Sequence, residues 1–182
     1  MGGSVQVRVA PAGREPRSEA HSLLLELAGG FVGRPSLSHD EHGRPQVDGV
    51  AVSISYSRRR IAVAASYDGP VGVDLEEREP RDFWGLAERW FGAGELEWMA
   101  GEVDQLGAFL RLWTAKEAVG KALGIGLRGA GLRRVVPVGG GVVESAPGLQ
   151  VTYVACAGAV LAVAAPVGVG VSPTLDPACV RG

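Results

Sequence analysis

Two Ala- and Val-rich segments far apart in this 182-residue chain are almost identical. Residues 61–65 read Ile-Ala-Val-Ala-Ala and residues 161–165 read Leu-Ala-Val-Ala-Ala. Each follows another β-branched run across a turn, which predicts two hairpins, at residues 52–66 and 151–166. The match is either a coincidence between two strands of similar composition or an internal repeat. A repeat predicts two related α+β halves, divided near residue 70.

The stretch between the two hairpins has the pattern of helices. Apolar periodicity and capping residues predict helices at residues 82–91, 94–103 and 106–123, and Gly124 is placed to end the last one. A short β-branched strand at residues 71–75 precedes them. This order of strands and helices predicts an α+β protein of one domain or two small ones.

Further along the chain, residues 133–138 predict another strand, because apolar β-branched side chains dominate them. The last dozen residues, 171–182, are rich in proline and small side chains, and we expect them to form a loose tail. Cys156 and Cys179 are too few and too far apart for a disulfide framework, so they read as ordinary thiols.

Charge and hydropathy exclude several classes of protein. The net charge of -2 and a pI near 5.9 argue against a domain that binds nucleic acid by neutralising phosphates. No apolar stretch reaches the ~18 residues of a membrane-spanning helix. The N-terminus lacks the basic and apolar segments of a secretory signal, so we expect a cytoplasmic protein with no membrane partner.

Two carboxylates share one face of the strand that follows the first hairpin. Residues 72–77 read Gly-Val-Asp-Leu-Glu-Glu, and alternation along the strand turns Asp74 and Glu76 to one side and Val73 and Leu75 to the core. Paired carboxylates without His or Cys are the ligands of a hard cation such as Mg²⁺. The alternative is an acidic strand end that faces water, because this pattern is common.

The longest predicted helix carries a second charged group. Trp113, Glu117 and Lys121 are four residues apart and form one stripe. The simplest explanation is a surface Glu–Lys pair that contributes ~0.2–0.5 kcal/mol. The alternative is that Glu117 completes the carboxylate group and Lys121 binds a phosphate. Of 18 basic residues only Lys116 and Lys121 are lysine, and both lie in this helix.

Basic residues nearer the N-terminus can complete a site for an anion. Arg44 lies in a constrained Gly-Arg-Pro turn, and three arginines at residues 58–60 cap the first hairpin after Ser55 and Tyr56. A guanidinium offers a planar fork for phosphate oxygens. Each arginine alone reads as a solvated surface charge, so the hypothesis depends on their combination with the carboxylates and lysines.

Taken together, these motifs resemble the 4'-phosphopantetheinyl transferase superfamily in its Sfp-type branch. The resemblance runs from about residue 20 to 167 and rests mainly on residues 71–76 and 113–121 with the spacing between them. Weaker elements support it, namely residues 43–45, 52–57, 90–95 and 124–127.

The resemblance implies the pseudo-dimeric α+β fold of the family, with two similar halves of which the first is shortened. One half covers residues 1–70 and contacts the coenzyme A nucleotide. The other covers residues 71–170 and carries the metal and catalytic motifs, with the tail at residues 171–182. The resemblance also implies that the protein is a monomer.

The activity that the resemblance implies is Mg²⁺-dependent transfer of the phosphopantetheine arm of coenzyme A. The acceptor is a serine of an apo acyl, peptidyl or aryl carrier protein, and the products are holo-carrier and 3',5'-ADP. Matching positions make Asp74, Glu76 and Glu117 the metal ligands, with Glu117 and Lys121 catalytic as base and as phosphate-charge stabiliser. The positions expected near coenzyme A are Arg44, Ser55, Tyr56, Arg58, Glu95, Lys116 and Lys121.

The chain departs from the family pattern at Tyr56, where the family usually has a histidine that reaches a coenzyme A phosphate. A phenol donates a hydrogen bond but brings no positive charge near neutral pH. Arg58, or a neighbour at residues 59–60, is our candidate to replace that charge. Two alternatives stay open: a non-catalytic relative that binds coenzyme A or a carrier protein, and a generic metal-binding α+β domain.

Overall fold

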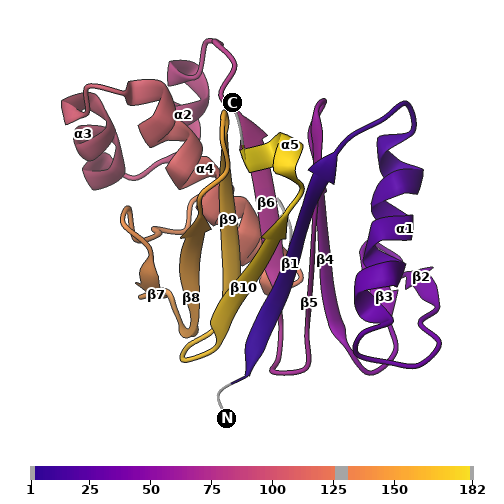
Figure 1. The fold of residues 1–182 in the computed structure, drawn as a ribbon. Helices are drawn as coiled ribbons and strands as arrows, with labels where there is room; N and C mark the ends of the chain where they lie inside the picture. The colour runs from indigo at the N-terminus through magenta and orange to yellow at the C-terminus, as the bar shows by residue number, and fades with distance from the viewer. Residues whose placement is uncertain (1–2, 126–130, 181–182) are drawn as a thin grey trace.

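A computed structural model of the chain describes residues 3–125 and 131–180, and two four-stranded sheets dominate it (Figure 1). The first sheet has the order β10-β1-β5-β4. Its strands are β1 (Ser4–Pro11), β4 (Ala51–Tyr56), β5 (Arg60–Ser66) and β10 (Gly170–Leu175). β5 pairs antiparallel with both β1 and β4, which confirms the predicted hairpin.

The C-terminal strand β10 corrects the expectation of a loose tail from residue 171. β10 pairs in parallel with β1, so that Ser4 lies opposite Gly170 and Val9 opposite Leu175. Backbone hydrogen bonding to a free sheet edge holds this segment despite its proline. Pro173 fits because β10 is itself an edge strand, where a missing N–H costs little.

The second sheet is antiparallel throughout and has the order β6-β9-β8-β7. Its strands are β6 (Gly72–Glu77), β7 (Gly141–Val143), β8 (Ala146–Val154) and β9 (Ala159–Pro166). The two similar Ala/Val segments occupy β5 and β9, and each of these is an inner, buried strand of its sheet. The fold class is therefore α+β with two sheet regions, as predicted.

The helices and a small two-stranded sheet complete the described structure. These elements are α1 (Pro16–Ala28), β2 (Leu37–His39), β3 (Pro45–Val47), α2 (Trp84–Trp90), α3 (Ala93–Gly101), α4 (Gln105–Ala122) and α5 (Pro177–Val180). The Asp104 side chain accepts the Gly107 N–H at 2.9 Å and caps α4. Gly124, with φ +71°, follows its C-terminal end, so the predicted helices and the glycine stop are confirmed.

Alternation along the central strands divides the interior into three cores. Ile61, Val63 and Ala65 of β5 pack toward α1, whereas Ala62 and Ala64 pack toward the second sheet. On β9, in the same way, Leu161 and Val163 face the first sheet, and Ala162 and Ala164 face α4. The two sheets therefore lie between α1 on one side and α4 on the other (Figure 1).

The strand predicted at residues 133–138 is wrong, because this segment forms turns and irregular backbone. The N–H of Val136 donates to the Glu95 side chain, and the carbonyl of Arg134 accepts from Lys116. Its backbone groups are thus satisfied by side chains of α3 and α4, not by a neighbouring strand. Within the described residues, no helix is both long and apolar enough to cross a bilayer.

Candidate active site

Asp74 lies at the centre of the group of charged residues predicted from the sequence. It belongs to β6, which packs against α4, and its side chain is buried. Its Oδ1 accepts hydrogen bonds from the Ser55 hydroxyl at 3.0 Å and from the Lys121 ammonium at 2.8 Å. Its Oδ2 is buried without a hydrogen-bond partner, so the carboxylate has one oxygen left for another ligand.

Lys121 connects the two sheets at this point. Its Nζ donates to Asp74, to the carbonyl of Val73 at 2.9 Å and to the carbonyl of Ile54 at 3.2 Å. Val73 lies on β6 and Ile54 on β4, so one ammonium group contacts both halves. The three donors of an ammonium match these three acceptors.

Glu117 lies one turn before Lys121 on α4 and responds electrostatically to the β6 carboxylates. Burial is the largest cause that raises the pKa of Glu117 to about 7, and the charges of Asp74 and Glu76 raise it further while Lys121 opposes them. The packing of α4 against β6 therefore brings the three carboxylates predicted from the sequence close enough to interact electrostatically.

Glu76 has a partner that the sequence analysis missed. The Arg81 guanidinium donates to Glu76 Oε2 at 3.0 Å and to the carbonyl of Glu77 at 2.9 Å. Burial, followed by the charge of Asp74, raises the pKa of Glu76. Arg81 lies only five residues after Glu76 in the sequence, and this short separation was the signal that could have predicted the ion pair.

A divalent cation was expected among Asp74, Glu76 and Glu117. Across residues 3–125 and 131–180, no three His, Cys, Asp or Glu side chains converge as a ready-made metal cluster. Lys121 instead pairs with Asp74, and Arg81 with Glu76. The unpartnered Asp74 oxygen and the all-carboxylate donor set nonetheless fit a hard cation, which prefers oxygen ligands.

Two serines of β4 and one just after it fix the position of β6. Ser53 and Ser55 accept the backbone N–H groups of Val73 at 3.0 Å and Leu75 at 3.1 Å. Just past the strand, Ser57 donates to Glu77 at 2.7 Å. Ser55, predicted to contact coenzyme A, is thus buried between the strands. The alternating serines at positions 53, 55 and 57 were the sequence signal for this contact.

Arg44 lies at the edge of a cavity of about 490 Å³ that Lys121 also lines. Its guanidinium pairs with Asp40 at 2.5 Å and donates to the Gly124 carbonyl at 2.5 Å. The backbone N–H of Arg44 is the main cause that holds the pKa of Asp40 at about 2. The cavity runs along β4 to the end of α4 and has the size of a small-molecule site.

Glu95 and Lys116, both predicted near coenzyme A, form a buried ion pair. Their atoms are 2.8 Å apart, and the Lys116 side chain is 0% exposed. Glu95 also accepts the N–H groups of Gly92 and Val136, and the Lys116 ammonium lies 5.1 Å from the Phe91 ring centre. Burial lowers the pKa of Lys116. The pair holds α3 and the segment near Val136 against α4.

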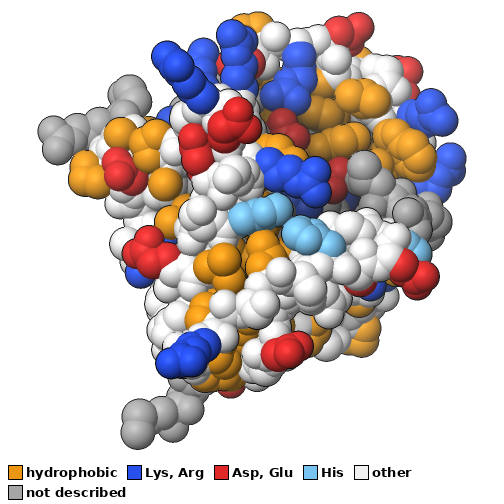
Figure 2. All heavy atoms as spheres, turned by 90° about the vertical axis from the view of Figure 1, so that its right-hand side faces the viewer, with side chains coloured by type: hydrophobic (Ala, Val, Ile, Leu, Met, Phe, Trp, Pro, Cys, Tyr) orange, Lys and Arg blue, Asp and Glu red, His pale blue; other side chains and the backbone are white. Residues whose placement is uncertain are grey.

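The tip of the β4–β5 hairpin carries Tyr56 and Arg58, and both side chains are exposed. Arg59 pairs with Glu79 and Arg60 with Glu77, whereas Arg58 has no ion pair among the described residues. Lys and Arg side chains gather along the upper part of the face that includes α1, beside a band of hydrophobic side chains (Figure 2). In the motif expected after α4, Gly126 and Leu127 lie outside the described residues.

Comparison with known proteins identifies a family and several relatives that this chain resembles. The family model for the 4'-phosphopantetheinyl transferase superfamily matches residues 70–138, which include Asp74, Glu76, Glu117 and Lys121. The 4'-phosphopantetheinyl transferase AcpT of Salmonella typhimurium is 40% identical over 116 residues, which cover 62% of this chain and 57% of that protein.

Two further relatives carry the same enzyme name. The 4'-phosphopantetheinyl transferase HetI of Nostoc sp. is 28% identical over 130 residues, 64% of this chain and 55% of HetI. The 4'-phosphopantetheinyl transferase gsp of Aneurinibacillus migulanus is 35% identical over 91 residues, 48% of this chain and 38% of gsp. The chain spans about half the length of the curated relatives it matches. Part of the chain, residues 70–138, is therefore similar to the 4'-phosphopantetheinyl transferase superfamily, and the relatives named here carry that enzyme name.

Proposed function

We propose that this protein transfers the 4'-phosphopantetheine arm of coenzyme A to a serine of an apo acyl or peptidyl carrier protein. The observation that carries the proposal is the group formed by Asp74, Glu117 and Lys121, at the edge of a cavity that Lys121 and Arg44 line. The cations Lys121 and Arg44 at this cavity suit the phosphates of a pyrophosphate substrate, and the neighbouring carboxylates suit a hard metal ion.

In the proposed reaction, the carrier serine oxygen attacks the phosphorus that bears the pantetheine arm. The bond from that phosphorus to the oxygen of 3',5'-ADP breaks, and 3',5'-ADP leaves with the electron pair. Glu117 accepts the serine proton, and a carboxylate with a pKa near 7 is suited to that task. In this proposal the positive charge of Lys121 stabilises the negative charge on the departing phosphate.

Asp74, Glu76 and Glu117 are the residues that we propose hold Mg²⁺. The free oxygen of Asp74 and the purely carboxylate donor set support this assignment. When bound, Mg²⁺ supplies positive charge to the pyrophosphate oxygens. In support of this, the carboxylates of β6 lie close enough to Glu117 of α4 to raise its pKa.

The direct test is to incubate the purified protein with coenzyme A, Mg²⁺ and an apo carrier and to measure the intact mass of the carrier. Transfer adds one phosphopantetheine group. Glu117→Gln should abolish the mass change, and Asp74→Ala should reduce the rate in a way that extra Mg²⁺ only partly restores. Glu144→Gln, on the exposed turn after β7, is the matched control and should behave as wild type.

A protein that binds coenzyme A or a carrier without any mass change, across several carrier types, would instead be a non-catalytic relative. Full activity of Glu117→Gln would overturn the site assignment while leaving the activity in place. The pairing of Lys121 with Asp74 beside Glu117 favours the enzyme, because binding alone does not require a base.

Arg58 is our candidate for the charge that Tyr56 does not supply. Arg59 and Arg60 are engaged by Glu79 and Glu77, so Arg58 is the arginine of this hairpin tip that is left for a ligand. Arg58→Ala should raise the KM for coenzyme A and change kcat little. Unchanged kinetics would exclude Arg58 from the coenzyme site.

A further inference from the structure

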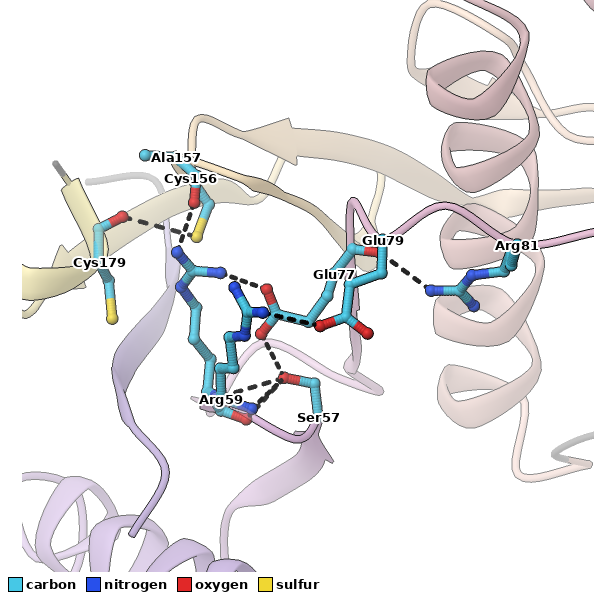
Figure 3. A network of polar contacts seen from close by, with 9 residues as sticks. Ser57, Arg59, Glu77, Glu79, Arg81, Cys156, Ala157 and Cys179 are labelled. Carbon is cyan, nitrogen blue, oxygen red and sulfur yellow. Dashed lines mark hydrogen bonds and ion pairs between the residues drawn. The ribbon is translucent and has the colours of Figure 1, made fainter. Parts of the chain in front are cut away.

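The segment that follows Glu76 is tied to the β4–β5 hairpin by a separate polar network (Figure 3). The Arg60 guanidinium pairs with the Glu77 carboxylate, with side-chain exposures of only 12% and 6%. Ser57 donates to the same carboxylate at 2.7 Å. A second arginine of the hairpin, Arg59, pairs with Glu79 at 3.1 Å near the surface.

Arg60 also reaches a third segment. Its second terminal nitrogen donates to the carbonyl of Ala157 at 2.6 Å, in the turn between β8 and β9. The N–H of Ala157 in turn donates to the carbonyl of Cys179 in α5 at 3.2 Å. One largely buried guanidinium therefore joins the first sheet, the end of β6 and the neighbouring β8–β9 turn of the second sheet.

The place of Glu77 in the strand connects this network to the carboxylate site. Successive side chains point to opposite faces of a strand. Glu76 therefore faces α4 with Asp74, while Glu77 faces the hairpin and Arg60. The ion pair between Glu77 and Arg60 on one face of the strand end therefore fixes the orientation of the Glu76 carboxylate on the other face.

We infer that Arg60 and Glu77 are positioning residues for the metal and coenzyme site, an inference that rests on the proposed function. They hold the end of β6 so that Glu76 stays beside Asp74 and Glu117. They also hold the hairpin that carries Tyr56 and Arg58 at a fixed distance from these carboxylates. Neither residue contacts the substrate in this scheme.

The chain offers a matched pair of substitutions. Glu77→Gln and Glu79→Gln each remove one negative charge from an acid that pairs with a hairpin arginine, and neither acid is a proposed metal ligand. Glu77 is buried in the network, whereas the Glu79 side chain is 38% exposed. Glutamine keeps the shape of the side chain at both positions, and at position 77 it can still accept the hydrogen bond from Ser57. Both variants are therefore expected to fold.

The probe is Mn²⁺, titrated into the protein with saturating coenzyme A and followed by electron paramagnetic resonance. Supporting residues around a metal typically contribute about 10-fold to its affinity. We therefore expect Glu77→Gln to weaken Mn²⁺ binding by about 10-fold, and Glu79→Gln to leave it unchanged. In the transfer assay, Glu77→Gln should raise the Mg²⁺ concentration for half-maximal rate, with kcat at saturating Mg²⁺ within about twofold of wild type.

Arg60 gives an independent check through a conservative variant. Arg60→Gln should weaken Mn²⁺ binding as Glu77→Gln does. Arg60→Lys keeps the charge beside Glu77 but loses the planar fork that also reaches Ala157, so it should recover part of the affinity. Circular dichroism and thermal melting establish that each variant is folded at the assay temperature.

Equal Mn²⁺ affinities for Glu77→Gln and Glu79→Gln would overturn the inference. So would a loss of kcat at saturating Mg²⁺ without any change in Mn²⁺ affinity, or a wild-type protein that binds no Mn²⁺. A wild-type protein that binds Mn²⁺ with the expected differences between variants, yet loads no carrier, would reject the proposed function and support the positioning role.

Discussion

The only two lysines of the chain occupy positions where an arginine does not fit the surrounding acceptors. Lys121 meets one carboxylate and two carbonyls from different strands, and Lys116 is enclosed between Glu95, the Arg134 carbonyl and the Phe91 ring. A compact ammonium donates in several directions, whereas a guanidinium is a rigid plane. In a chain that otherwise uses arginine, lysine stands where the geometry of the acceptors requires it.

Lys121→Arg tests this geometry at the residue scale. The charge is kept, but the planar fork cannot meet Asp74, Val73 and Ile54 together. We expect the transfer rate to fall by about 10-fold or more, which corresponds to ~1.4 kcal/mol or more of lost transition-state stabilisation. Steady-state kinetics with an apo carrier measures the effect, and near-normal turnover of the variant would contradict it.

The pKa of Glu117 predicts how stability depends on pH in protein that is free of metal. The pKa of this carboxyl rises from 4.5 in the unfolded chain to about 7 in the folded protein, so the folded protein holds the proton more tightly. Its contribution to stability is therefore complete below about pH 4.5 and is lost as the pH rises through 7. Because the group is partly exposed and solvent screens it, the loss is about 1–2 kcal/mol.

Urea unfolding in the presence of a chelator, repeated from pH 5 to pH 8, measures this dependence. Glu117→Gln has no proton to lose. The unfolding free energy of the wild type should therefore fall relative to that of the variant as the pH rises across this range. Parallel curves for the two proteins would show that Glu117 titrates normally in the fold.

At the scale of elements, the contact between β6 and α4 brings the carboxylates to Lys121. The two elements approach closely at Gly72, where a Cβ atom would lie 1.9 Å from the carbonyl oxygen of Ala118. The close approach is backbone against backbone, so a larger side chain at this position cannot be accommodated by a change of rotamer. Gly72 thus sets the distance between the strand with Asp74 and the helix with Glu117.

Gly72→Ala tests this contact. The added methyl group must push β6 away from α4, and overpacking of this kind costs about 3 kcal/mol. Thermal or chemical unfolding measures the loss. The matched control is Gly85→Ala on α2, where a Cβ meets nothing within 4 Å and the helix gains from alanine. Equal stability of the two variants would show that the helix and strand can separate at little cost.

At the scale of the whole molecule, the first sheet is completed by the end of the chain. β10 supplies the strand beside β1, and α5 follows it with Cys179 buried at 1% exposure. The N–H of Asp176 donates to the carbonyl of Val9 at 2.8 Å, which extends the pairing beyond the strand. The first sheet therefore combines strands from the two ends of the described chain, since it contains strands from residues 4–66 and also the strand of residues 170–175.

Removal of residues 170–182 should destabilise the whole protein. The truncation opens the edge of β1 and removes the buried Cys179 and the partly buried Val171 and Leu175 from the core between the sheets, which costs about 3 kcal/mol or more. A shorter truncation after Leu175 keeps β10 and should cost less. Urea unfolding of the wild type and the two truncated proteins measures the order of their stabilities. A protein without β10 that is as stable as the wild type would contradict this prediction.

The sequence predicted the elements with a strong local signal and missed those that depend on partners. Strand alternation placed Asp74 and Glu76 on one face, and helical spacing aligned Glu117 with Lys121. The same rules failed at residues 133–138, where side chains of Glu95 and Lys116 satisfy the backbone, and in the tail, where β1 offers a free edge. Local pattern does not report which distant group satisfies a backbone N–H or carbonyl.

The sequence by itself determined the class of fold and the residue types of the site, because periodicity and motif spacing are local properties of the chain. Only the tertiary structure decided which charges meet. In the folded protein Lys121 pairs with Asp74, and Lys116 is buried with Glu95. Arg60 pairs with Glu77, whereas Arg58 is exposed. Burial and distance set the strength of an ionic contact, and both are known only once the two sheets and α4 are packed together.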